Sequence, residues 1–176
     1  MSRVNRRRFL KSTSTLAAGA GLGYCSSRSL GRSQSVNERP CFALIGCGGQ
    51  GTGDARRALA FGDMAVACDV DSAHSAYVQD IFTKRLGREG KKANIETCED
   101  YRAVIDRDDI DAIICGTVDH WHVKIAAEAL KSGKDVYCEK PLTLTVDEGR
   151  IISKVVEETG QLLQVGTQQR SDERFL

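Results

Sequence analysis

No two cysteines in the sequence have the C-x-x-C spacing, although the chain contains seven cysteines among its 176 residues. An odd set of cysteines without that spacing indicates neither a zinc site nor a disulfide framework. Most of them follow short apolar runs or lie within them, so we interpret them as buried free thiols. The seven are Cys25, Cys41, Cys47, Cys68, Cys98, Cys115 and Cys138.

The main part of the chain also lacks an excess of positive charge. Residues 1–40 hold eight Arg or Lys and one acid, whereas the other 136 residues hold 17 bases and 23 acids. A basic patch on the folded part, which nucleic-acid binding requires, is therefore not expected. Hydrophobic residues at 41% and charged residues at 28% are close to the average of soluble globular proteins, which argues against wholesale disorder and against a membrane bundle.

The first 39 residues combine a basic start with a weakly apolar stretch. Residues 6–11 read R-R-R-F-L-K, and residues 16–23 are too short and too rich in glycine for a transmembrane helix. Residues 6–11 resemble the twin-arginine export signal, whose pattern R-R-x-F-L-K they match at every fixed position. We therefore expect residues 1–39 to be a signal peptide and a polar linker. The resemblance implies the twin-arginine (Tat) translocon as a partner and a periplasmic or other extracytoplasmic location; the alternative is a disordered basic arm.

From residue 40 on, short apolar runs alternate with longer helix-like stretches. The pattern predicts strands at residues 41–45, 64–68, 95–97, 112–115, 136–138 and 162–165. It predicts helices at residues 52–61, 72–86 and 101–107, and one around Val123, Ala126, Ala127 and Leu130. Continuous apolar strands separated by helices are typical of a parallel sheet that helices cover on both faces. We predict a doubly wound α/β sheet without internal repeats.

The last predicted helix has a capping box, because Thr145 is followed three residues later by Glu148. Its buried stripe is predicted at Ile151, Ile152, Val155 and Val156, and Gly160 ends it. Asp100 is expected to cap the helix that starts at residue 101.

A glycine motif stands between the first predicted strand and the first helix. Residues 46–51 read G-C-G-G-Q-G, which is the G-x-G-x-x-G pattern in the strand-to-helix setting that gives it meaning. Gly46 permits the tight turn, Gly48 lets the backbone approach a pyrophosphate, and Gly51 lets helix and strand pack closely. The N–H groups at the start of the helix, at Gly49 and Gln50, are expected to face the phosphates.

Asp69 ends the next predicted strand, 18 residues after Gly51. A carboxylate there accepts hydrogen bonds from an adenosine ribose and repels a 2′-phosphate. The expected cofactor is therefore NAD rather than NADP, and residues 40–166 are predicted to form an NAD(P)-binding domain with a Rossmann-type doubly wound parallel sheet.

Two further motifs follow the fourth and fifth predicted strands: residues 116–122, which read G-T-V-D-H-W-H, and residues 139–141, which read E-K-P. Together with the glycine turn and Asp69 they resemble the Gfo/Idh/MocA family of oxidoreductases from about residue 41 to the chain end. The resemblance implies that Lys140 is catalytic and also lies beside the cofactor, where it positions substrate and stabilises charge. It further implies that Glu139, Thr117, His120 and His122 contact or line the cofactor, and that the bond before Pro141 is cis.

His120 and His122 by themselves do not predict a metal site. Two histidines spaced i, i+2 do not share a helical face, and the sequence shows no third ligand. We therefore expect no metal.

Full-length members of the family continue into a second α/β domain, which supplies a catalytic histidine, most substrate contacts and the oligomer interface. Residues 167–176 resemble the entrance to that domain, so we expect a truncated chain without stable oligomers. Three functions stay open: an NAD-dependent dehydrogenase that acts on a small sugar-like or polyol substrate once a second domain is supplied, an NAD-dependent glycoside hydrolase of the same family, and a non-catalytic nucleotide-binding module.

Overall fold

The computed structural model describes residues 39–90, 94–168 and 170. The predicted signal and almost all of the predicted linker therefore lie outside the described residues, as do residues 171–176. Arg39, the last residue assigned to the linker, contacts the folded part, because its guanidinium donates to the carbonyls of Leu59 and Gly62 at 3.0 and 2.8 Å. None of the helices in the described part has the length and hydropathy of a membrane span.

Six parallel strands form one sheet in the order β3-β2-β1-β4-β5-β6. The first strand lies in the middle; the chain adds β2 and β3 on one side of it and then returns to add β4, β5 and β6 on the other. In sheets wound this way, ligands bind beyond the carboxyl ends of the strands where the two halves diverge, here between β1 and β4. The strands are β1 (Cys41–Ile45), β2 (Asp63–Cys68), β3 (Glu96–Cys98), β4 (Ala112–Cys115), β5 (Asp135–Glu139) and β6 (Leu163–Gly166).

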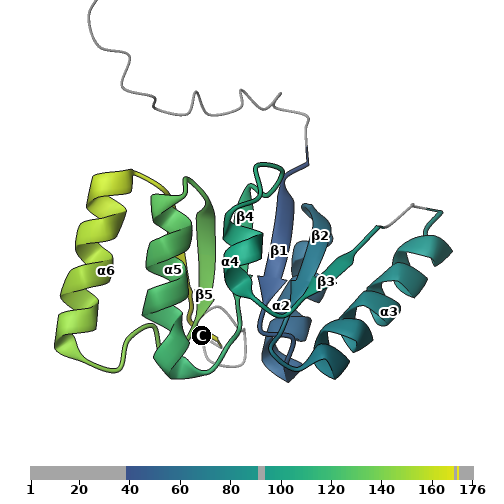
Figure 1. The fold of residues 1–176 in the computed structure, drawn as a ribbon, viewed down its shortest axis with the longest axis horizontal. Coiled ribbons are helices and arrows are strands. Elements are labelled where there is room, and N and C mark those ends of the chain that lie inside the picture. The colour runs from purple at the N-terminus through teal and green to yellow at the C-terminus, as the bar shows by residue number, and fades with distance from the viewer. Residues whose placement is uncertain (1–38, 91–93, 169, 171–176) are drawn as a thin grey trace, which may run out of the picture. The chain divides into compact units, whose positions relative to one another are not determined.

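Helices cover both faces of the sheet. Helices α2 (Gly49–Ala58) and α3 (Ser72–Arg88) pack on one face, through a cluster that includes Phe82 and Leu44. Helices α4 (Tyr101–Ile105), α5 (His122–Lys131) and α6 (Val146–Thr159) pack on the other, and Figure 1 shows α5 and α6 side by side. Buried apolar side chains on both faces confirm the predicted doubly wound α/β sheet.

The observed boundaries lie within three residues of the predicted ones. The largest difference is at α2, which begins at Gly49 rather than at residue 52. The first turn of α2 is therefore built from part of the glycine motif. Glycine has a low intrinsic helix propensity, so the sequence pattern hides this turn.

The capping box of α6 is confirmed, because the Thr145 hydroxyl accepts a hydrogen bond from the Glu148 N–H at 3.2 Å. The predicted buried stripe is wrong at Ile151, whose side chain is 53% exposed. Neighbouring residues on a helix point about 100° apart, so α6 packs through Ile152 and Val155 and turns Ile151 outward. The carboxylate of Asp100 caps α4 as predicted, since it accepts from the Arg102 N–H.

Candidate functional site: a dinucleotide cavity at the carboxyl edge

The glycine turn packs backbone against backbone at the carboxyl end of β1. Gly46 has a backbone φ of +92°, which residues with a Cβ rarely adopt. A Cβ at this position would also lie 2.5 Å from the carbonyl carbon of Gly116. A Cβ on Gly51 would overlap the carbonyl oxygen of Gly46. The roles predicted for the first and third glycines of the motif are therefore visible as contacts: a tight turn, and a close approach of helix to strand.

Gly48 is different, because a Cβ at this position would meet no protein atom within 4 Å. Its φ of −66° and ψ of −179° are also open to other residues. Gly49 likewise has open space around it. No side chain caps the N–H groups at the start of α2, so they are available to an anion. This turn fits the pyrophosphate of a dinucleotide, which takes the space that a side chain would fill.

Asp69 fixes the turn from the end of β2. One carboxylate oxygen accepts a hydrogen bond from the Cys47 N–H at 2.7 Å, and the other accepts from the Asp71 N–H at 2.9 Å. The His74 Nδ1 atom lies 3.8 Å from the same carboxylate. Two backbone donors hold this negative charge at the wall of the cavity.

A cavity of about 760 Å³ opens at this edge of the sheet, between the two halves. Of the predicted cofactor residues it gathers Gly46, Gly48, Asp69 and Thr117 in its lining. Its volume lies within the range of small-molecule and cofactor sites, roughly 300–1,000 Å³.

Two aromatic residues lie in the cavity wall: Trp121, which belongs to the segment expected beside the cofactor, and Tyr101, which was not predicted. Tyr101 and Trp121 both line the cavity, and their rings meet edge to face with centroids 5.9 Å apart. Val70 and Ile125 add further apolar surface to the lining. Flat apolar walls of this kind suit a heteroaromatic base. Trp121 is part of the 116–122 motif, but Tyr101 comes from α4, and only the fold brings the two together.

A second group of predicted residues lies at the carboxyl end of β5. The Glu139 side chain is buried, and its Oε1 atom accepts hydrogen bonds from the Tyr137 hydroxyl at 3.2 Å and from Gln50 Nε2 at 3.5 Å. Gln50 also accepts a hydrogen bond from Gln168 Nε2 at 2.8 Å. Gln50 thus links the glycine turn to the end of β5.

Asp54 completes this polar group and was not predicted. It is buried on α2, where both of its carboxylate oxygens accept from Gln50 Nε2. Burial raises the pKa of the Asp54 carboxyl, the Gln50 hydrogen bond lowers it, and the nearby Glu139 carboxylate raises it again, which leaves it above its ordinary value. The i, i+4 spacing from Gln50 is the sequence signal for this contact.

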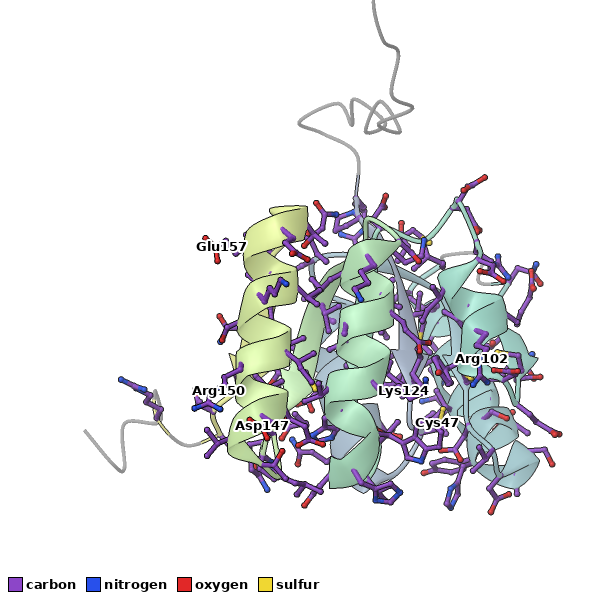
Figure 2. All side chains as sticks on the ribbon, turned by 60° about the vertical axis from the view of Figure 1, so that its left-hand side comes forward. Cys47, Arg102, Lys124, Asp147, Arg150 and Glu157 are labelled. Carbon is purple, nitrogen blue, oxygen red and sulfur yellow. The ribbon has the colours of Figure 1, made fainter. Side chains whose placement is uncertain are left out.

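Lys140 follows Glu139 and is exposed at the same edge of the sheet. Its backbone N–H donates to Glu139 Oε2 at 3.2 Å, and the Lys140–Pro141 bond is cis as predicted. The first turn of α6, which Asp147 and Arg150 mark in Figure 2, comes soon after Lys140, while Glu157 lies at the opposite end of that helix.

The two histidines predicted to line the cofactor take other positions. His120 is exposed, and its ring centroid lies 6.2 Å from that of Trp121. His122 is 1% exposed and is not among the residues that line the cavity. Its Nδ1 atom lies 2.6 Å from the Pro141 carbonyl oxygen and its Nε2 atom 3.1 Å from that of Thr117. His122 therefore connects the segment after β4 to the segment after β5.

The family model described as an oxidoreductase family with an NAD-binding Rossmann fold matches residues 41–167. The chain belongs to this Gfo/Idh/MocA family. The match spans β1 to β6 and includes the glycine turn, Asp69 and Glu139-Lys140-Pro141. The described residues form the NAD-binding Rossmann domain of the family.

Several proteins of known name are similar to this member of the family. A glycosyl hydrolase family 109 protein of Shewanella pealeana is 28% identical over 89% of this chain and 38% of its own length. An inositol 2-dehydrogenase of Rubrobacter xylanophilus is 32% identical over 77% of this chain and 37% of its own length. The solved myo-inositol 2-dehydrogenase of Lactobacillus plantarum has a TM-score of 0.66 and 28% identity, over 77% of this chain and 38% of its own. The chain thus spans less than two fifths of the length of these relatives.

Proposed function

We propose that this chain is the nucleotide-binding part of an NAD-dependent dehydrogenase that oxidises a hydroxyl group of a sugar-like or polyol substrate. The observation that carries the proposal is the open backbone at Gly48 beside a cavity of about 760 Å³, with Lys140 exposed at the same edge of the sheet. The inositol dehydrogenases among the relatives support the substrate class.

The charge at the cavity wall favours NAD over NADP. Asp69 and Asp71 both line the cavity, and backbone N–H groups hold the Asp69 carboxylate in place. A ribose with free hydroxyls donates hydrogen bonds to such a carboxylate, whereas a 2′-phosphate is repelled by it.

Bound NAD would supply the hydride acceptor. In this proposal the Lys140 ammonium stabilises the alkoxide that develops as the substrate hydroxyl loses its proton. Buried Glu139, fixed by Tyr137 and Gln50, orients the start of the segment that carries Lys140. The general base and most substrate contacts come from a second domain, which the greater length of the relatives supports.

Calorimetry with NAD and NADP, followed by a panel of sugars, polyols and glycosides, tests this function. We expect the chain to release heat on binding NAD and to bind NAD at least about tenfold more tightly than NADP. In the form that also carries the second domain, we expect net NADH formation with one polyol or sugar. Glycoside cleavage without net NADH would support the hydrolase instead, and NAD binding without any turnover would support a binding module. A folded chain that binds neither nucleotide contradicts all three.

The Lys140→Met variant, made in the form of the protein that forms NADH, distinguishes the role of Lys140 in NAD binding from its role in the reaction. We expect about a 100-fold lower kcat, since one electrostatic partner of the developing charge is lost, with an unchanged Kd for NAD. Lys131→Met, an exposed lysine at the last turn of α5, is the matched control and should change neither quantity.

The alternative hydrolase function is supported by the name of a relative whose match covers most of this chain. The match to the family 109 protein covers 89% of the 176 residues of this chain. This is more than the 138 residues from 39 to 176. That similarity therefore reaches into residues 1–38, whereas the match to the inositol 2-dehydrogenase covers 77%.

We also propose export through the twin-arginine pathway, supported by residues 6–11 of the sequence. Because proteins cross by this pathway in the folded state, the chain can bind NAD in the cytoplasm and carry it out. Replacing Arg6 and Arg7 together with lysine should retain the protein in the cytoplasm of a host with this pathway, as measured by cell fractionation. Unchanged export of the double variant would reject this signal, and nucleotide-free exported protein would reject the carriage of NAD.

A further inference from the structure

A cluster of two cysteines and one histidine lies directly beneath the cavity edge. Cys115 ends β4, Cys138 is its register partner on β5, and His122 begins α5. The two Sγ atoms and a ring nitrogen of His122 all lie within 4.8 Å of one another. The two thiols are 0% exposed and His122 is 1% exposed. Within residues 39–90, 94–168 and 170, this is the only group of at least three potential ligand side chains at such distances.

The surroundings of His122 place one acceptor at each ring nitrogen. A neutral imidazole has one N–H donor and one lone pair, yet both ring nitrogens face carbonyl oxygens. The contact from Nδ1 to the Pro141 carbonyl oxygen, at 2.6 Å, is the shorter of the two, so we assign the N–H to Nδ1. The Nε2 lone pair then faces a second acceptor, the Thr117 carbonyl oxygen at 3.1 Å. A metal ion bound to Nε2 would take the place of this contact, because an ion about 2.0 Å from the nitrogen does not fit between it and the Thr117 oxygen. The Nδ1 contact suits such a site, since metal-binding histidines characteristically donate their other N–H to a backbone carbonyl or carboxylate.

We propose that Cys115, His122 and Cys138 bind a thiophilic metal ion, with Zn²⁺ as the first candidate. Two thiolates and one imidazole are ligands that Zn²⁺ prefers and that Mg²⁺ and Ca²⁺ do not. The Thr117 hydroxyl lies 3.5 Å from Cys115 Sγ.

The bound ion would tie together two segments that carry the candidate site. The segment after Cys115 contains Thr117, which lines the cavity, and the residue after Cys138 is Glu139. His122 already bridges these segments through Thr117 and Pro141. Zinc binding would therefore stabilise the carboxyl edge of β4 and β5 without occupying the cavity.

The sheet contains a matched control pair. Cys68 and Cys98 are register partners on β2 and β3, as Cys115 and Cys138 are on β4 and β5. Both pairs lie in the same row at the carboxyl edge, with Ile45 between them. Among the residues that the structure describes, no histidine forms a three-residue group of potential ligands with Cys68 and Cys98. A cross-strand pair of thiols is therefore present twice, and a histidine completes only one of them.

The test is metal binding by the chelator-treated, reduced chain. Titration with Zn²⁺ against a chromophoric chelator should give one ion per chain, with release of thiol protons. Co²⁺ should give the thiolate charge-transfer absorption of a sulfur-ligated tetrahedral site. X-ray absorption of the zinc form should show two sulfur ligands at about 2.3 Å, and this readout needs no variant.

Cys115→Ser and Cys138→Ser should each weaken Zn²⁺ binding at least about 100-fold, because the loss of a hydrogen-bond partner of a ligand already costs about 10–100-fold and these variants lose a ligand itself. Cys68→Ser and Cys98→Ser should bind as the unmodified chain does. Circular dichroism confirms that each variant is folded. Three results would each overturn the proposal: no bound zinc in the unmodified chain, equal affinity in Cys115→Ser, or a zinc absorption spectrum without sulfur ligands.

Discussion

Replacing Gly48 with alanine should weaken NAD binding by about 100-fold, or roughly 2.7 kcal/mol, and leave the fold intact. The added methyl group occupies the space in which the pyrophosphate approaches the backbone, and no protein atom lies within 4 Å of it. The φ and ψ of Gly48 suit alanine, so the cost to stability is that of a weaker N-cap, below about 1 kcal/mol. Calorimetry with NAD and chemical denaturation measure the two quantities separately.

Gly87→Ala is the matched control for this substitution. Gly87 lies near the end of α3, a Cβ there also meets nothing within 4 Å, and it does not line the cavity. NAD should bind this variant as tightly as it binds the unmodified chain. If Gly48→Ala also keeps its affinity within about twofold, the pyrophosphate does not approach the turn and the assignment of the cavity is wrong.

Replacing Gly51 with alanine should destabilise the protein by about 3 kcal/mol or more, because overpacking between fixed backbones forces them apart. The new Cβ would overlap the Gly46 carbonyl oxygen and would lie 3.3 Å from Leu44 Cδ1 in the core. Neither neighbour can move easily, since Gly46 also packs against the backbone of Gly116 and Leu44 is fully buried in β1. Urea denaturation followed by circular dichroism gives the change in the free energy of unfolding.

Gly53→Ala tests the same helix without the overlap. Gly53 lies two residues further along α2 and has no heavy atom within 4 Å of a built Cβ. Alanine is a better helix former than glycine by about 1 kcal/mol, so this variant should be as stable as the unmodified chain or more stable. Equal stability of the Gly51 and Gly53 variants would show that α2 does not pack on the turn as described.

The parts of the site that were predicted from sequence are local in the chain. The glycine turn needs only a strand, six residues and a helix in succession, and Asp69 is placed by the next strand along. The Thr145 capping box and the Asp100 cap are also local, because helix capping joins residues two or three positions apart. Such features are determined by spacing along the chain, and spacing can be read directly.

The parts that were missed or misplaced depend on contacts between distant residues. Gln50 meets Glu139 across 89 positions and Gln168 across 118, and neither partner carries a sequence signal for the other. His122 looks like a ligand-facing residue in its motif, yet the packing of α5 against β4 and β5 buries it. Ile151 lies next to the buried stripe of α6, and only the orientation of that helix on the sheet decides that it faces outward.

The sequence by itself determined the α/β alternation, the dinucleotide turn and the charge that favours NAD, because hydrophobic period, glycine spacing and strand ends are properties of short segments. Only the tertiary structure decided which cysteines face each other. Cys115 and Cys138 are 23 positions apart, and they meet because β4 and β5 pair in one particular register. A shift of that register by one residue would turn one thiol to the other face of the sheet, and the sequence does not state the register.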